Sequence, residues 1–147
     1  MLRYFAYGSN LDQLQMQHRC PGSSLLSVGS LPDYKLAFTA FSKTWNAGVA
    51  DVVMADGERV WGLVYALSEA DLSALDEWEG YPEQYTRFLG SIETPAGSIE
   101  AWLYTVSNKK EIVAPSRQYL EIIRQAALRH GFPEAYVRML AEVEITE

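Results

Sequence analysis

Cysteine is almost absent from this chain of 147 residues, in which Cys20 stands alone. One thiol cannot form an internal disulfide, and there is no set of cysteines with the spacing of a zinc site. We therefore expect a fold held together by a hydrophobic core, in a reducing, cytoplasmic compartment. Cys20 itself is expected to be a small, half-buried hydrophobic residue.

Long apolar runs and basic clusters are missing as well. No run approaches 18 apolar residues, so no transmembrane helix is expected. The apolar start of the chain is short and lacks the cleavage pattern of a signal peptide. The net charge is -7, and Lys109-Lys110 is the only basic cluster, which argues against a surface for nucleic-acid phosphates. We expect neither a membrane nor a nucleic acid as partner.

Cofactor and metal motifs are missing too. The chain has no P-loop and no G-x-G-x-x-G segment, and its two histidines, His18 and His130, lie far apart without a partner pattern. A Ser-His-Asp triad using Ser9 is conceivable, but the G-x-S-x-G elbow that would expose the serine is absent. We expect no cofactor and no metal.

What the chain does contain is a series of short apolar runs separated by turn residues, with no repeat and no linker, so we expect one domain over residues 1–147. Strands are predicted at 2–7, 34–41, 48–54, 60–67, 85–93 and 98–106. Asp56-Gly57, between two of these runs, predicts a hairpin turn. The run 60–67 is apolar on both faces, as in a strand that is covered on both sides.

Helix signals alternate with these strands. Asn10 is predicted to cap a short helix through Leu11, Leu14 and His18. A capping box at 68–71 predicts a helix that ends at Gly80, with Leu72 and Leu75 facing inward. Two further helices are expected, one from Pro115 to Gly131 and one after Pro133. The sum is an α+β fold, a small mixed, mostly antiparallel β-barrel with flanking helices.

Three segments carry candidate chemistry. Tyr7-Gly8-Ser9-Asn10 follows a strand and precedes a helix, so its backbone N–H groups suit a carboxylate or an oxyanion, although a plain capped turn has the same pattern. The segment 76–79 places three carboxylates at a helix end, where one held against Trp78 would have a raised pKa, and the alternative is a solvated acidic helix end. Tyr119 is either core or a hydroxyl in a pocket.

Together these segments resemble the γ-glutamylcyclotransferase-like family, which includes the plant AIG2-type proteins. The resemblance rests on Y-F-A-Y-G-S-N-L at 4–11, T-W-N-A-G-V-A at 44–50, V-W-G-L-V-Y at 60–65, L-D-E-W-E-G at 75–80, Tyr85, and P-S-x-x-Y at 115–119. The segments keep their order over nearly the whole chain, and together they are far more specific than Y-G-S-N alone.

The resemblance implies a barrel with a cavity at the loop 7–10 and Glu79 as the catalytic general acid/base. It implies a substrate-binding set made of Tyr7, Gly8, Ser9, Asn10, Tyr85 and Tyr119. The reaction it implies turns a γ-glutamyl amide into 5-oxoproline and a free amine, without protein nucleophile, metal or cofactor. The loop matches neither the glutathione-specific G-Y-G-S-L pattern nor the γ-glutamylamine Y-G-T-L pattern, which favours γ-glutamyl amino acids as substrates.

Three alternatives stay open at this point. The same chemistry could act on a γ-glutamyl amine or a γ-glutamyl-protected intermediate. The chain could be a binding module without activity, although a buried carboxylate without a task is costly. Glu77 and Glu79 could form a hydrolase pair, but neighbours two apart on a helix point in different directions. The expected partner is a small γ-glutamyl molecule, and a homodimer is left open.

Overall fold

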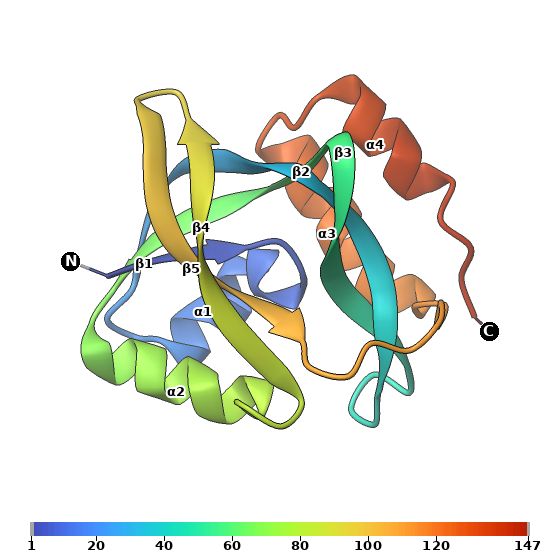
Figure 1. The fold of residues 1–147 in the computed structure, drawn as a ribbon, viewed down its shortest axis with the longest axis horizontal. Helices are drawn as coiled ribbons and strands as arrows, with labels where there is room; N and C mark the ends of the chain where they lie inside the picture. The colour runs from blue at the N-terminus through green and yellow to red at the C-terminus, as the bar shows by residue number, and fades with distance from the viewer. Residues whose placement is uncertain (1, 147) are drawn as a thin grey trace.

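Five strands close into a barrel in the computed structural model, which describes residues 2–146 (Figure 1). They are β1 (Leu2–Ala6), β2 (Ser24–Ser42), β3 (Ala47–Leu67), β4 (Tyr85–Thr94) and β5 (Gly97–Val106). Around the barrel the order is β1-β3-β2-β4-β5. The β1–β5 pair is parallel and the other pairs are antiparallel. The predicted mixed, mostly antiparallel barrel with flanking helices is confirmed.

The two longest strands, β2 and β3, form one hairpin from Ser42 opposite Ala47 to Ser24 opposite Ala66. The prediction of a hairpin turn at Asp56-Gly57 is wrong, because both residues lie within β3. They belong to a bulge, where β3 runs through four residues, 55–58, opposite the single residue Asp33 of β2.

Local contacts explain why this Asp-Gly pair does not reverse the chain. Asp33 and Gly57 both have positive φ, 65° and 78°, and the Gly57 N–H donates to Asp33 Oδ1 at 3.1 Å. The two strands therefore bend together here, and pairing continues on both sides of the bulge.

The helices lie outside the barrel (Figure 1). The described chain forms a short 3-10 helix, η1 (Ser9–Leu11), and α1 (Gln13–Arg19), α2 (Glu69–Glu79), α3 (Arg117–Arg129) and α4 (Glu134–Ala141). The helices α1 and α2 lie side by side, and α3 packs against α4 on the other side of the molecule. Within residues 2–146, none of the helices is long and apolar enough to cross a membrane.

The start of α1 differs from the prediction. Asp12, not Asn10, is the N-cap, and its carboxylate accepts the N–H groups of Leu14 and Gln15. The reason is that the chain first makes the 3-10 turn η1, which moves the N-cap of the α-helix two residues further along the chain. Leu14 consequently points to solvent at 84% exposed, while Met16 is buried.

The predicted helix α2 is confirmed at both ends. The Ser68 hydroxyl accepts the Asp71 N–H at 3.1 Å and the Asp71 carboxylate accepts the Ser68 N–H at 3.2 Å, which completes the capping box. Gly80 ends the helix with φ 68°. Leu72 and Leu75 are buried as expected. The caps therefore set the bounds of the helix, and Asp76 of its last turn joins the barrel through hydrogen bonds from Arg87 of β4 and Tyr104 of β5.

The core fills the barrel and extends under α3 and α4, with Phe5, Leu63, Leu103 and Ile123 fully buried. Cys20 is also fully buried, more deeply than predicted. The first strand, β1, is short: its last pairing joins Ala6 to Leu63, while β3 continues for many residues beyond. The barrel wall therefore opens where the chain leaves β1 and enters the loop 7–10.

Candidate active site

A cavity of about 690 Å³ lies at this opening. Every residue of the predicted site lines it: Tyr7, Gly8, Ser9, Asn10, Glu79, Tyr85 and Tyr119. These residues come from the end of β1, from η1, from the end of α2, from the start of β4 and from α3. The fold thus brings together all seven positions, and their individual roles stay predictions.

Glu79 is the last residue of α2, and its side chain is 18% exposed. Burial raises the pKa of this carboxyl from its ordinary 4.5 to about 7, and the nearby positive charge of Arg19 limits the rise. A group with a pKa near 7 can both accept and donate a proton at neutral pH. Glu79 therefore has the protonation behaviour of a general acid/base.

The other two carboxylates of this turn do something else. Asp76 accepts two hydrogen bonds from Arg87, at 2.9 and 3.1 Å, and a third from the Tyr104 hydroxyl at 2.7 Å. Glu77 is exposed. Of the three acidic side chains, Glu79 alone lines the cavity, so the interpretation as a solvated acidic helix end does not describe this turn.

The opening loop is held in place through the Asn10 side chain. Its Nδ2 donates to the Tyr4 hydroxyl at 2.9 Å. Its Oδ1 accepts from Gln15 Nε2 at 3.0 Å and from Arg19 Nη1 at 3.1 Å. Asn10 is 4% exposed. Its amide thus ties the loop to both β1 and α1, a structural task that differs from the cap we predicted.

The backbone of the loop closes on itself through two hydrogen bonds. The Leu11 N–H donates to the Gly8 carbonyl and the Asp12 N–H donates to the Ser9 carbonyl, both at 3.0 Å. These bonds use the carbonyl groups of Gly8 and Ser9 and not their N–H groups. The cavity wall at 8–10 is therefore a tight turn of backbone, as an anion-binding loop requires.

Three tyrosines of the predicted set are anchored by their hydroxyl groups. Tyr7 donates to the Tyr104 carbonyl at 2.6 Å, and Tyr85 donates to the Ala50 carbonyl at 2.9 Å. The Tyr119 hydroxyl accepts the N–H of the same Ala50 at 3.0 Å. Burial raises the pKa of all three phenols above 10, so they are neutral in the cavity wall.

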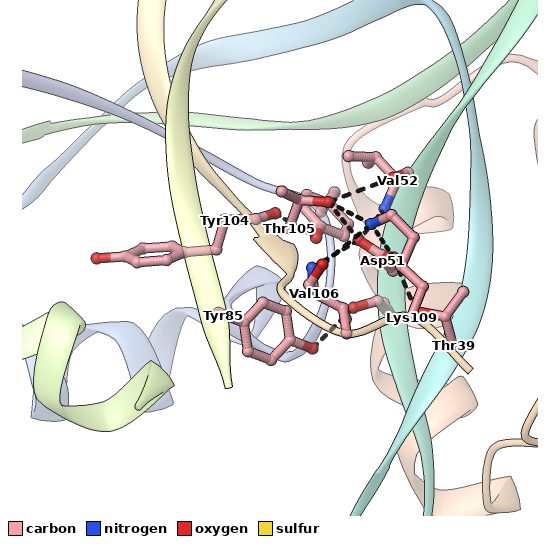
Figure 2. A network of polar contacts seen from close by, with 10 residues as sticks. Thr39, Asp51, Val52, Tyr85, Tyr104, Thr105, Val106 and Lys109 are labelled. Atoms are coloured by element: carbon pink, nitrogen blue, oxygen red, sulfur yellow. Dashed lines mark hydrogen bonds and ion pairs between the residues drawn. The ribbon is translucent and has the colours of Figure 1, made fainter. Parts of the chain in front are cut away.

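Next to Ala50 lies a buried carboxylate that sequence analysis missed. Asp51 is fully buried and receives hydrogen bonds from several donors (Figure 2). Its partners are the hydroxyls of Thr39 and Thr105, the N–H groups of Val52 and Val106, and Lys109 Nζ at 2.6 Å.

These contacts join β3 to β5 beyond the end of β1, where the strands that flank β1 would otherwise separate. Asp51 directly follows Ala50, whose carbonyl and N–H groups anchor Tyr85 and Tyr119. The signal for this network was a lone acidic residue in the apolar run 48–54.

Other cavity residues gave no local signal. Arg19 and the Trp78 ring lie together, with the guanidinium 4.7 Å from the ring centroid. Lys43 and Lys110 line the cavity from the β2–β3 turn and from the segment after β5. Only the fold brings these three cations to one hollow. Within residues 2–146, no group of three or more His, Cys, Asp or Glu side chains could hold a metal ion.

Comparison with known proteins shows which proteins this chain is similar to. A γ-glutamylcyclotransferase of Bos taurus is 35% identical over 147 residues, which cover 96% of this chain and 78% of the relative. The γ-glutamylcyclotransferase of Homo sapiens gives the same identity and coverage. The chain belongs to the γ-glutamylcyclotransferase family. It is therefore a member of an enzyme family, and the resemblance noted in the sequence is confirmed.

Two further matches agree with this membership. The profile of the AIG2-like family matches residues 59–140. A solved structure described as a γ-glutamyl cyclotransferase superposes with a TM-score of 0.92 at 33% identity, covering 99% of this chain and 89% of the other. Sequence and fold thus agree that this chain belongs to the γ-glutamylcyclotransferase family.

Proposed function

We propose that this γ-glutamylcyclotransferase family member converts a γ-glutamyl amino acid into 5-oxoproline and a free amino acid, with Glu79 as general acid/base. The observation that carries the proposal is the largely buried Glu79 carboxyl, with a pKa of about 7, on the same cavity as the loop 8–10. The cavity volume of about 690 Å³ lies in the usual range for small-molecule sites.

The reaction needs no atom from the protein to become bonded to the substrate. Glu79 takes a proton from the substrate's α-ammonium group, and the freed amine attacks the γ-carbonyl carbon. A five-membered ring with a tetrahedral centre forms. Glu79 then gives its proton to the leaving nitrogen, the γ-oxyanion re-forms the carbonyl, and the bond between this nitrogen and the γ-carbon breaks. The ring nitrogen passes its second proton to the released amine, so that 5-oxoproline and the amino acid in its ammonium form result. One carboxyl of intermediate pKa serves the first two of these proton transfers.

Binding has to hold the γ-glutamyl group in a folded conformation. Orienting the amine towards its own carbonyl lowers the barrier by limiting the motions that separate them. The N–H groups of Gly8, Ser9 and Asn10 are the proposed donors to an anionic oxygen of the substrate, because backbone N–H groups in a tight turn suit such an oxygen. Tyr7 and Tyr85 are proposed to flank the bound substrate in the cavity.

The chemistry of the leaving group is our reason for proposing γ-glutamyl amino acids, and not γ-glutamyl amines, as substrates. Lys43 and Lys110 line the cavity, and in the described part of the chain neither has a carboxylate partner. A leaving amino acid carries a carboxylate that these ammonium groups would attract, whereas a leaving amine has none. The cations therefore favour γ-glutamyl amino acids over γ-glutamyl amines.

Release of 5-oxoproline from γ-glutamyl dipeptides tests the acid/base role. Glu79→Gln should keep the fold and the substrate affinity and lose turnover by about three orders of magnitude or more. Glu77→Gln is the matched control, because Glu77 is an exposed acid of the same turn, and its turnover should stay within about threefold. A well-folded Glu79→Gln enzyme with unchanged turnover would remove Glu79 from this role, as would a comparable loss at Glu77.

A pair of donors tests the substrate class. γ-Glutamyl-alanine and γ-glutamyl-ethylamine differ in the leaving group by one carboxylate, and we expect the first to have the higher kcat/KM. Equal or reversed kcat/KM would support an amine or another γ-glutamyl compound as substrate. Calorimetric binding of both compounds without 5-oxoproline release would instead support a binding module.

We also propose that residues 1–147 act as one domain in a reducing cytoplasm, with no nucleic-acid partner. The support is the lone buried Cys20 and the net charge of -7. Fractionation of cells tests the location. Light scattering of the purified chain tests the homodimer that the sequence left open.

A further inference from the structure

We propose that the Tyr119 hydroxyl is a preset hydrogen-bond donor to the substrate's γ-carbonyl oxygen, and that it stabilises the oxyanion formed during ring closure. This inference rests on the proposed function and assigns one further catalytic group within it. It follows from the direction of the hydrogen bonds that surround the cavity, and from the place of Tyr119 against the loop 8–10.

The hydroxyl oxygen of Tyr119 is occupied as an acceptor. It accepts the Ala50 N–H at 3.0 Å. A phenol has one proton to donate and two lone pairs to accept with. With the Ala50 N–H directed at the oxygen, the proton is left for a further acceptor, and the structure describes none for it within residues 2–146.

The hydroxyls of the two other anchored tyrosines act as donors, whereas that of Tyr119 acts as an acceptor. Tyr7 uses its proton for the Tyr104 carbonyl and Tyr85 uses its proton for the Ala50 carbonyl. Their hydroxyls can still accept, but their protons are engaged. Among these three cavity tyrosines, Tyr119 is therefore the one whose proton is directed at neither a carbonyl nor a carboxylate of the protein.

Tyr119 also lies in the right place. A Cβ atom built on Gly8 would be 3.0 Å from the Tyr119 hydroxyl, so this oxygen is in contact with the loop whose N–H groups are proposed to bind an anionic oxygen. The residue is 3% exposed and lines the cavity. Backbone donors and a phenol that converge from two elements resemble the oxyanion sites of acyl-transfer enzymes.

The ring is held rigidly, which a preset donor requires. The Trp45 ring packs edge-on against it with centroids 5.0 Å apart, and the Phe38 ring does so at 6.5 Å. Burial raises the pKa of the Tyr119 phenol, so the hydroxyl stays protonated and can donate a hydrogen bond. Because the charge on the γ-oxygen develops only during attack, such a donor acts on kcat more than on KM.

The first test is Tyr119→Phe, which removes the hydroxyl and keeps the ring. We expect kcat for 5-oxoproline release to fall about 100-fold while KM changes by less than about threefold. Tyr136→Phe is the matched control, because Tyr136 is a buried phenol outside the cavity, and its kcat should stay unchanged. A Tyr119→Phe enzyme with kcat within threefold of the parent, or with a raised KM only, overturns the inference.

A second variant separates donation from structure, because Phe also leaves the Ala50 N–H without an acceptor. 3-Fluorotyrosine placed at position 119 keeps the hydroxyl and makes it a more acidic donor. We expect this enzyme to keep at least a third of the parent kcat, also if the Phe variant does not fold. A loss as large as that of Phe would overturn the inference. Absence of 5-oxoproline with the parent enzyme would instead sink the proposed function itself.

Discussion

Arg19 Nη1 lies 3.8 Å from Glu79 Oε2, and both side chains are largely buried, at 15% and 18% exposed. The guanidinium is fixed by Asn10 Oδ1 and by the Trp78 ring. Burial raises the pKa of Glu79 and the cation opposes this rise, which leaves the pKa at about 7. The two residues together set the proton affinity on which the proposed chemistry depends.

Removal of the Arg19 cation should therefore make Glu79 a weaker acid, with a higher pKa. In Arg19→Gln nothing offsets the burial of Glu79, and we expect its pKa to rise above 7. The rising limb of kcat/KM against pH should move to higher pH. Arg19→Lys keeps a positive charge and should move the limb less. A limb that is unchanged in the Gln variant would mean that Arg19 does not act on Glu79.

Glu79 should also reduce stability as the pH rises. Its folded-state pKa of about 7 lies above the ordinary 4.5, so the folded chain binds more protons than the unfolded chain between these values. The unfolding free energy should fall by about 3 kcal/mol from this group as the pH rises from 4.5 through 7. Urea unfolding at several pH values measures the fall.

Glu79→Gln should lack this loss, and so should become more stable relative to the parent as the pH rises. Glu77→Gln provides the comparison, because Glu77 is exposed and this variant keeps Glu79. Its difference in stability from the parent should not grow as the pH rises. If the parent and the Glu79→Gln variant have the same pH dependence of stability, Glu79 is not a desolvated acid.

Gly8 should tolerate no side chain. A Cβ at this position would lie 3.0 Å from the Tyr119 hydroxyl and 3.3 Å from Ala50 Cβ. Gly8→Ala should displace the hydroxyl from the loop and reduce kcat at least tenfold, with a modest loss of thermal stability. Steady-state kinetics and a melting curve measure both. Gly97→Ala at the start of β5 is a useful comparison, since there the Cβ meets nothing within 4 Å and only its φ of 116° opposes it. Full activity of the Gly8→Ala enzyme would show that the contact is not tight.

The Asp51 network should stabilise the barrel wall. Hydroxyl, N–H and ammonium donors all point at this carboxylate, so the amide nitrogen of Asp51→Asn would face a donor. We expect the unfolding free energy to fall by about 2–4 kcal/mol. Lys109→Met should be milder because the other donors stay, and Lys110→Met, which removes no contact to Asp51, should be neutral. Equal stability of the parent and the Asp51→Asn variant would contradict this account.

Much of the fold could be predicted because its signals are local. The capping box at 68–71 and the αL position of Gly80 determine the bounds of α2 and so place Glu79 at its end. The pattern failed where two structures share one local signal. An Asp-Gly pair suits a hairpin turn and also a bulge, and the choice depends on whether the strands continue to pair on both sides.

The candidate site was predictable only in part, because some of its residues meet only in the folded chain. The loop 7–10 was a candidate from its local pattern and Glu79 was chosen through the resemblance, but Arg19 and the Asp51–Lys109 pair were not predicted. Their partners are distant in sequence and meet only when the barrel closes. Asn10 shows the limit well: its type suited a helix cap, whereas the 3-10 turn gave that task to Asp12 and left Asn10 to hold Arg19.

The pH dependence of kcat/KM for 5-oxoproline release from a γ-glutamyl amino acid tests the central claim most directly. If Glu79 is the buried base, the rate constant should rise with pH along a limb whose pKa is about 7. A limb at the ordinary pKa of a solvated glutamate, 4.5, or no limb at all between pH 5 and 8, would contradict the account.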